Sequence, residues 1–167
     1  NKNGLGFHKP GMWDKIIDIN TCYLQKDPSN EIRNSIRKFS FENDLAFYDY
    51  YNKNGLLRTL MIRTSSSGDL MVLIQFFKND LKKINGLLDY LKSEFSEISS
   101  LNYCINMKDN DTLYDQKVIC YSGKTYIEYI QMIIIISLTF PDKNIVIRPH
   151  PAEDQEIYRK VFDNFDN

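Results

Sequence analysis

Cysteine and histidine are the residues of this chain best suited to binding a metal ion or acting as nucleophiles. The chain has only five of them, at His8, Cys22, Cys104, Cys120 and His150. No two have the CxxC or HxxxH spacing that places two ligands on one metal ion. The sequence also has no glycine-rich phosphate loop and no Ser/His/Asp arrangement. We therefore expect no catalytic residue in this chain, and we interpret the second and third cysteines as small buried side chains of strands.

Basic residues near aromatic ones suggest a different chemistry, the binding of RNA. His8 and Lys9 follow a phenylalanine, and Arg58 and Arg63 lie within one expected strand, residues 56–64. A guanidinium group pairs with phosphate through two hydrogen bonds, and aromatic rings stack on unpaired bases. Because the two arginines are an odd number of positions apart, they face opposite sides of a strand unless a bulge intervenes. From the pattern alone, ordinary surface charge is the competing explanation.

The elements that would position these residues follow from periodicity and from turn residues. Residues 4–19 are expected to be extended, because glycine and proline punctuate a partly alternating pattern. Apolar residues at helical spacing predict a first helix from about 30 to 43, with Ser29 or Asn30 capping its free N–H groups. A second helix is predicted over 80–95, with one apolar face formed by Leu81, Ile84, Leu88, Leu91 and Phe95.

Strands are predicted on both sides of the second helix. Residues 56–64 and 70–77 alternate around a short polar turn and predict a hairpin. Two further strands are expected near 101–106 and 117–121, separated by a polar loop. The order helix, hairpin, helix, strand, strand predicts an α+β fold in which helices pack on an antiparallel sheet. After residue 128 a short tail is expected, with a helix, a strand at 144–148 and a helix at 153–162.

Composition limits the class of protein. The 167 residues are 43% hydrophobic and 26% charged, with a net charge of −1, which is typical of a globular domain and excludes a fibrous or wholly disordered chain. Three cysteines are too few for a disulfide scaffold, which favours a reducing, cytoplasmic location. The longest apolar run, residues 132–136, is far too short to span a bilayer, so no membrane contact is expected. Because the sequence starts at Asn1 in mid-pattern, we interpret it as a piece of a longer protein.

Most of the chain resembles the central region of the RNA (uracil-5-)methyltransferase family, especially its 23S rRNA branch. The matching stretches are GLGFHKPGMWDKIIDINTCYLQ (4–25), PSNEIRNSIRKFSFENDLAFYD (28–49), GLLRTLMIRTSSSGDLMVLIQFF (55–77), LLDYLKSEFSEISSLNYCIN (87–106) and NDTLYDQKVICYSGKTYIE (110–128). The resemblance implies that the whole enzyme transfers a methyl group from S-adenosylmethionine to C5 of a uridine, after a cysteine has attacked C6.

The same resemblance implies that catalysis and RNA binding lie in different domains. In the family, the cofactor pocket, the nucleophilic cysteine and the general base lie in a C-terminal Rossmann-like domain, which residues 1–128 do not match. The resembling part corresponds to a central domain that helps to grip the RNA, for which Lys9, His8, Arg58 and Arg63 are our candidate contacts. Cys22 matches the position where some 23S rRNA enzymes supply the last thiolate of a 4Fe–4S cluster. One cysteine cannot hold that cluster, so we expect Cys22 to be a plain thiol unless a missing N-terminal part supplies the other ligands.

The tail, residues 129–167, departs from this family. FPDKNIVIRPHPAEDQEIYRKVF (140–162) resembles part of surface-carbohydrate biosynthesis proteins, which are similar to GT-B-type transferases. That resemblance implies phosphate contacts for Arg148 and His150. The competing explanation is a strand whose prolines merely end it. Two partial families in one chain would indicate a chimeric reading frame.

Our leading hypothesis is a fragment of an S-adenosylmethionine-dependent RNA uridine C5-methyltransferase acting on 23S rRNA. Such a fragment would bind RNA but would not transfer a methyl group on its own. The alternatives are a fragment of a carbohydrate transferase and a non-enzymatic interaction module.

Overall fold

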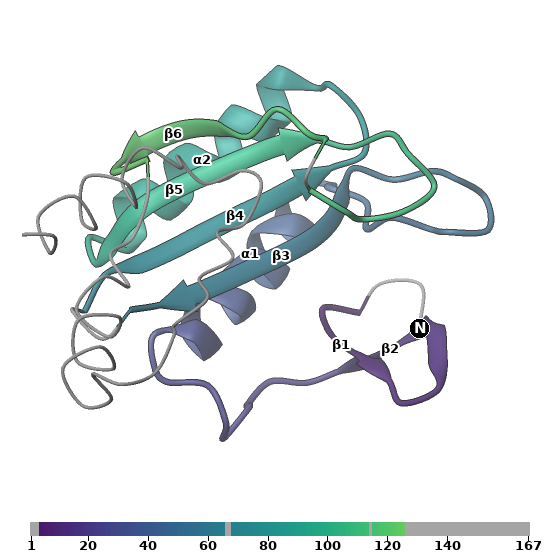
Figure 1. The fold of residues 1–167 in the computed structure, drawn as a ribbon, viewed down its shortest axis with the longest axis horizontal. Helices are drawn as coiled ribbons and strands as arrows, with labels where there is room; N and C mark the ends of the chain where they lie inside the picture. Colours follow the sequence, from purple (N-terminus) through teal and green to yellow (C-terminus); the bar gives the residue numbers. More distant parts are fainter. Residues whose placement is uncertain (1–3, 66–67, 114, 126–167) are drawn as a thin grey trace, which may run out of the picture.

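Two helices lie on one face of a four-stranded sheet, and a two-stranded hairpin lies to one side of them (Figure 1). The computed structural model describes residues 4–65, 68–113 and 115–125. Its elements in chain order are β1 (Gly6–Lys9), β2 (Met12–Asp18), α1 (Ser29–Glu42), β3 (Leu57–Thr64), β4 (Leu70–Phe76), α2 (Leu81–Glu94), β5 (Ile98–Ile105) and β6 (Ile119–Gly123). Every helix and strand expected before residue 125 is present, with ends shifted by a few residues. The tail and its expected elements lie outside the described residues.

The sheet is mixed, so the expected antiparallel sheet is wrong in one pairing. The strand order is β3-β4-β5-β6, with β3 antiparallel to β4 and β5 antiparallel to β6. β4 and β5, however, run parallel. The reason is that α2 connects them: a helix crossing one face of the sheet returns the chain to the same end, so the next strand runs in the same direction. The α+β expectation of helices packed on a sheet is otherwise confirmed.

Helix α1 begins differently from the sequence expectation. No side chain caps it, so capping by Ser29 or Asn30 is wrong. The Ile32 N–H donates to the Pro28 carbonyl at 2.9 Å. The Asn30 amide instead bonds the backbone of Cys22, accepting from its N–H at 2.8 Å and donating to its carbonyl at 3.2 Å. The helix start therefore holds the preceding loop rather than satisfying its own N–H groups.

Helix α2 begins as predicted and covers the sheet. The Asp80 side chain accepts a hydrogen bond from the Lys83 N–H at 3.2 Å, which is an ordinary N-cap. Leu81, expected on the buried face, is 51% exposed because it lies in the first turn, at the edge of the contact. The residues of α1, α2, β4 and β5 that are fully enclosed between helices and sheet are Ile32, Val72, Phe76, Ile84, Leu87, Leu88, Leu91 and Leu101.

The other face of the sheet carries a smaller apolar cluster. Leu73, Cys104 and Leu113 are buried there, with Met61 and Val118 packed against them. The segment between β5 and β6 contributes Leu113 and Val118 to this cluster. Cys104 is a buried strand residue as expected, whereas Cys120 on β6 is only half-buried. Within the described ranges, neither helix is long and apolar enough to cross a membrane.

Candidate nucleic-acid interface

Arg58 lies at a break in the edge strand β3. The pairing of β3 with β4 shifts between Leu57 and Thr59, so Arg58 is the extra residue of a bulge. Its guanidinium donates to the main-chain carbonyls of Asn106 at 2.9 Å and Lys108 at 2.5 Å. The bulge removes the regular alternation that would place Arg58 and Arg63 on opposite faces of the strand. Arg58 therefore holds the segment after β5 through the two hydrogen bonds of its Nη1 group.

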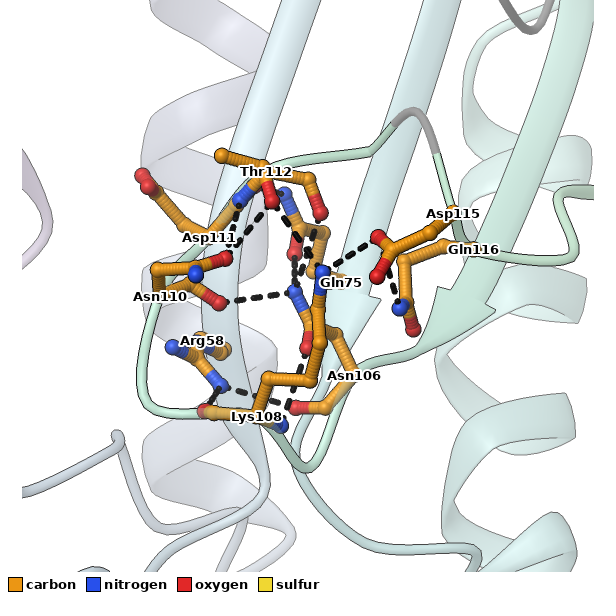
Figure 2. A network of polar contacts seen from close by, with 9 residues as sticks. All are labelled: Arg58, Gln75, Asn106, Lys108, Asn110, Asp111, Thr112, Asp115 and Gln116. Atoms are coloured by element: carbon orange, nitrogen blue, oxygen red, sulfur yellow. Dashed lines mark hydrogen bonds and ion pairs between the residues drawn. The ribbon is translucent and has the colours of Figure 1, made fainter.

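A network of buried amides fixes that same segment (Figure 2). Gln75 and Asn106 are almost fully buried, and the Asn106 Nδ2 donates to the Gln75 Oε1 at 2.9 Å. The Gln75 Nε2 in turn donates to the Asp111 carbonyl at 2.8 Å, and the Asn106 Nδ2 reaches the Asn110 carbonyl at 3.1 Å. Lys108 forms an ion pair with Asp115 across the loop. Since buried amides need partners, these bonds define one conformation of residues 106–113.

Two adjoining cavities, of about 300 and 550 Å³, lie between the β1–β2 hairpin, the β3 edge and the loop after β5. We call them together the hairpin cleft. The residues that line both are Gly4, His8, Ile16, Phe47, Tyr48, Arg58, Thr59 and Asp111. The cleft therefore brings His8 and Arg58 together, although they are far apart in the sequence.

The wall of the larger cavity is rich in tyrosine. The Tyr48 ring lies beneath the Arg58 guanidinium, with 4.8 Å between the guanidinium carbon and the ring centre. Tyr50 meets Tyr48 edge-to-face at 6.4 Å and Tyr51 edge-to-face at 6.3 Å. Tyr50 and Tyr51 remain 41% and 68% exposed. The turn carrying them depends on Gly55, whose φ is +115° and whose position would bring a Cβ within 2.3 Å of the Phe47 carbonyl oxygen.

Side-chain bonds tie this wall to the hairpin and to the loop. The Tyr51 hydroxyl donates to the Asp14 Oδ2 at 2.7 Å, and Lys15 lies 3.1 Å from the same oxygen. The Tyr51 hydroxyl, and then Lys15, lower the pKa of the Asp14 carboxyl below its usual value. On the other side, the Lys53 ammonium pairs with the Asp109 Oδ1 at 2.7 Å and lowers the pKa of that carboxyl. Both carboxylates are therefore charged at neutral pH.

The hairpin is fastened to α1 by two arginines one turn apart. Arg37 donates to the Asp18 Oδ1 at 2.8 Å and to the Leu5 and Ile19 carbonyls at 2.7 Å. Arg33, which is only 4% exposed, donates to the Ile19 carbonyl at 3.4 Å, and its guanidinium carbon lies 5.8 Å from the centre of the Phe7 ring. These bonds explain why a short hairpin keeps its place beside the sheet.

The remaining sequence-predicted residues are spread over the surface. His8 and Lys9 on β1 are exposed, and so is Arg63 near the end of β3, which lines neither cavity. Cys22 is half-buried, and the described part of the chain contains no group of three or more potential metal ligands. Arg148 and His150 lie outside the described residues. The tyrosines of the cleft were missed, although the run FYDYYN at 47–52 is an aromatic-rich signal in the sequence.

Comparison with known proteins gives two informative relatives. No model of a known protein family matches the chain. It is 48% identical over 127 residues to an uncharacterized RNA methyltransferase of Porphyromonas gingivalis, covering 75% of this chain and 27% of that protein. It is 42% identical over 127 residues to an uncharacterized RNA methyltransferase of Bacteroides thetaiotaomicron, covering 74% of this chain and 28% of that protein.

A solved structure has the same fold. The crystal structure of Pyrococcus abyssi tRNA (uracil-54, C5)-methyltransferase, in complex with S-adenosyl-L-homocysteine, aligns with a TM-score of 0.56 and 17% identity. The alignment covers 84% of this chain and 38% of that one. The chain is therefore similar to RNA methyltransferases over three quarters of its length, and it shares the fold of part of a tRNA uracil-C5-methyltransferase. These similarities support the family expected from the sequence.

The match covers only part of the family's length. The chain spans about a quarter of the first two RNA methyltransferases. The expected separate origin of the tail gains no support. An uncharacterized RNA methyltransferase of Fusobacterium nucleatum, 28% identical, aligns over 100% of this chain and so includes residues 129–167.

Proposed function

We propose that this chain is the RNA-holding central part of an S-adenosylmethionine-dependent enzyme that methylates C5 of a uridine in RNA, with 23S rRNA as substrate, in the cytoplasm. Residues 1–128 form that central domain in this proposal. The observation that carries it is the 48% identity to a protein named RNA methyltransferase. The structural neighbour with S-adenosyl-L-homocysteine supports the cofactor and the base.

The chain does not transfer a methyl group by itself in this proposal. Cys104 is a poor candidate for the nucleophile, because it is buried and burial raises the pKa of its thiol to about 11. The thiolate, which is the reactive form, is then scarce at neutral pH. Incubating the chain with radiolabelled S-adenosylmethionine and uridine-containing rRNA is expected to leave the RNA unlabelled. Labelled RNA would overturn this part of the proposal.

Electrostatic contact with RNA phosphates falls to the exposed cations. Lys9, His8 and Arg63 are exposed, whereas Arg58 already donates to two carbonyls and acts by positioning the loop. Each phosphate contact to single-stranded RNA contributes a slope of about −0.7 to the dependence of log K on log salt. Lys9→Ala and Arg63→Ala should each make that slope shallower by about this amount. Lys92→Ala, an exposed lysine of α2, is the control, and an equal effect there would contradict the assignment.

Cys22 could be a ligand of an iron–sulfur cluster only in a longer protein that supplies the other ligands. A 4Fe–4S cluster needs four ligands, and within the described residues Cys22 has no neighbouring group of ligands. Its loop is nevertheless fixed, because the Asn30 side chain holds both backbone groups of Cys22. We propose that Cys22 is a plain thiol in this chain. Reconstitution with iron and sulfide should give no visible absorption band, and a band would contradict this.

A further inference from the structure

The larger cavity of the hairpin cleft combines aromatic faces with carboxylates, and neither takes part in the phosphate contacts proposed above. Tyr50 and Tyr51 line it and remain substantially exposed. Half-exposed rings beside a cavity are the usual stacking surface for an unpaired base. Its volume of about 550 Å³ lies within the range of small-ligand pockets.

The charges around the cavity disfavour phosphate inside it. Four carboxylates, of Asp14, Asp49, Asp109 and Asp111, face two cations, Lys15 and Arg58, among the lining residues. A phosphate group would meet this excess of negative charge, whereas a hydrogen-bond donor would be attracted. The occupant that fits is therefore a neutral, planar group with N–H donors.

One of these carboxylates is available to a ligand. Asp14 accepts from Tyr51 and Lys15, and Asp109 pairs with Lys53. The Asp49 carboxylate accepts from the backbone N–H groups of Tyr51 and Asn52. The Asp111 carboxylate has no hydrogen-bond or ion-pair partner among the described residues. Its backbone is fixed by the bond from Gln75, and Figure 2 shows its carboxylate pointing away from the amide network.

We propose that the larger cavity binds one unpaired RNA base that carries an exocyclic amino group. The base stacks on the tyrosine wall, its amino group donates to the Asp111 carboxylate, and its phosphates stay outside the cavity. This rests on the proposed RNA-binding function and adds a base preference to it. Adenine, cytosine and guanine have such a donor, whereas the only Watson–Crick donor of uracil is its ring N3–H, which lies between two carbonyl oxygens that a carboxylate repels. The base held here is therefore a neighbour of the methylated uridine, not the uridine itself.

Fluorescence anisotropy with the full chain tests this directly. The probes are labelled oligouridines that differ only at one central position: adenine, cytosine, uracil or an abasic site. Adenine and cytosine are expected to bind about tenfold more tightly than uracil, a difference of about 1.4 kcal/mol. Asp111→Asn should remove this preference, because an amide also donates to the uracil carbonyl.

A second pair of variants tests the stacking surface. Tyr50→Leu should weaken binding of the adenine probe about tenfold and leave the abasic probe unchanged. Tyr50→Phe should retain binding. Tyr23→Leu, at a tyrosine that is 95% exposed and does not line the cleft, is the matched control.

The outcomes separate this inference from the function it rests on. Equal affinity for all four probes, or a base preference that survives Asp111→Asn, would overturn the base site while salt-dependent RNA binding stands. Absence of binding to every probe at low salt would overturn both.

Discussion

The guanidinium of Arg58 stacks on Tyr48, with 4.8 Å from its central carbon to the ring centre, and through the same group the edge of the sheet holds the loop after β5. A residue chosen from the sequence as a phosphate contact thus also positions the loop. The rest of the hairpin cleft depends on this arrangement, since Tyr48, Arg58 and Asp111 all line both of its cavities.

Replacing Arg58 should therefore destabilise the fold. Arg58→Met removes two hydrogen bonds from a charged donor, and we expect the free energy of unfolding to fall by about 2 kcal/mol. Urea denaturation followed by circular dichroism measures this. The matched variant is Arg63→Met, on the same strand but exposed, which should change stability by no more than about 0.5 kcal/mol. A loss of similar size in both variants would contradict the role given to Arg58.

Tyr48 carries a hydroxyl whose removal should stabilise the protein. The Tyr48 Oη is buried and has no hydrogen-bond partner among the described residues. An unsatisfied buried hydroxyl carries a desolvation penalty, so Tyr48→Phe should raise the free energy of unfolding by about 1 kcal/mol. Tyr121→Phe is the control: the Tyr121 hydroxyl donates to the Asp89 Oδ1 at 2.6 Å, and its loss should bring no gain. Thermal melts of the two variants compare them, and a destabilised Tyr48→Phe would refute the prediction.

Tyr51 should control the titration of Asp14. The Tyr51 hydroxyl is the main cause of the lowered pKa of Asp14, so Tyr51→Phe should raise that pKa toward its usual value. A depressed carboxyl pKa stabilises the fold above the unfolded-state pKa, and this stabilisation disappears as the pH falls through the lowered value. In Tyr51→Phe the pKa of Asp14 is less depressed, so acidification should remove a smaller amount of stability. Carboxyl carbon NMR gives the pKa of Asp14 in the native protein and in Tyr51→Phe, and Tyr50→Phe is the control. An unchanged Asp14 titration in Tyr51→Phe would show that the hydrogen bond from Tyr51 to Asp14 is absent in solution.

The cysteines should differ in reactivity. Burial raises the pKa of Cys104 to about 11, whereas Cys22 and Cys120 are half-buried. At pH 8 iodoacetamide should therefore modify Cys22 and Cys120 well before Cys104, which reacts only once the protein unfolds. Peptide mass spectrometry over time gives the three rates, and the same chain in urea provides the reference. Equal rates in the native protein would contradict the burial of Cys104.

The fold was largely predictable because its signals are local. The apolar stripes that contain Ile32 and Ile36 in α1, and Ile84 and Leu88 in α2, depend on residues within one or two turns, and both helices lie where these signals place them. The direction of β5 relative to β4 is not local. It depends on α2 packing across one face of the sheet, and no alternation pattern within either strand records that choice.

The candidate site was less predictable, for a similar reason. His8 and Lys9 are exposed as a basic pair should be, but the larger cavity of the cleft is formed by residues from four separate segments. Arg58 looked like a surface cation because its partners are main-chain carbonyls, which have no signature in the sequence. Arg33, buried by its bonds to Gln25 and Asn30, shows the same difficulty.

The parallel pairing of β4 with β5 has a consequence for the nascent chain. When β3 and β4 have emerged from the ribosome they can join as a hairpin, but the second edge of β4 stays open until all of α2 and then β5 have been synthesised. During that interval the apolar stretch Leu70–Phe76 presents unpaired backbone groups to any other strand nearby. Synthesis slowed or halted within α2 would therefore leave the chain at its most aggregation-prone stage.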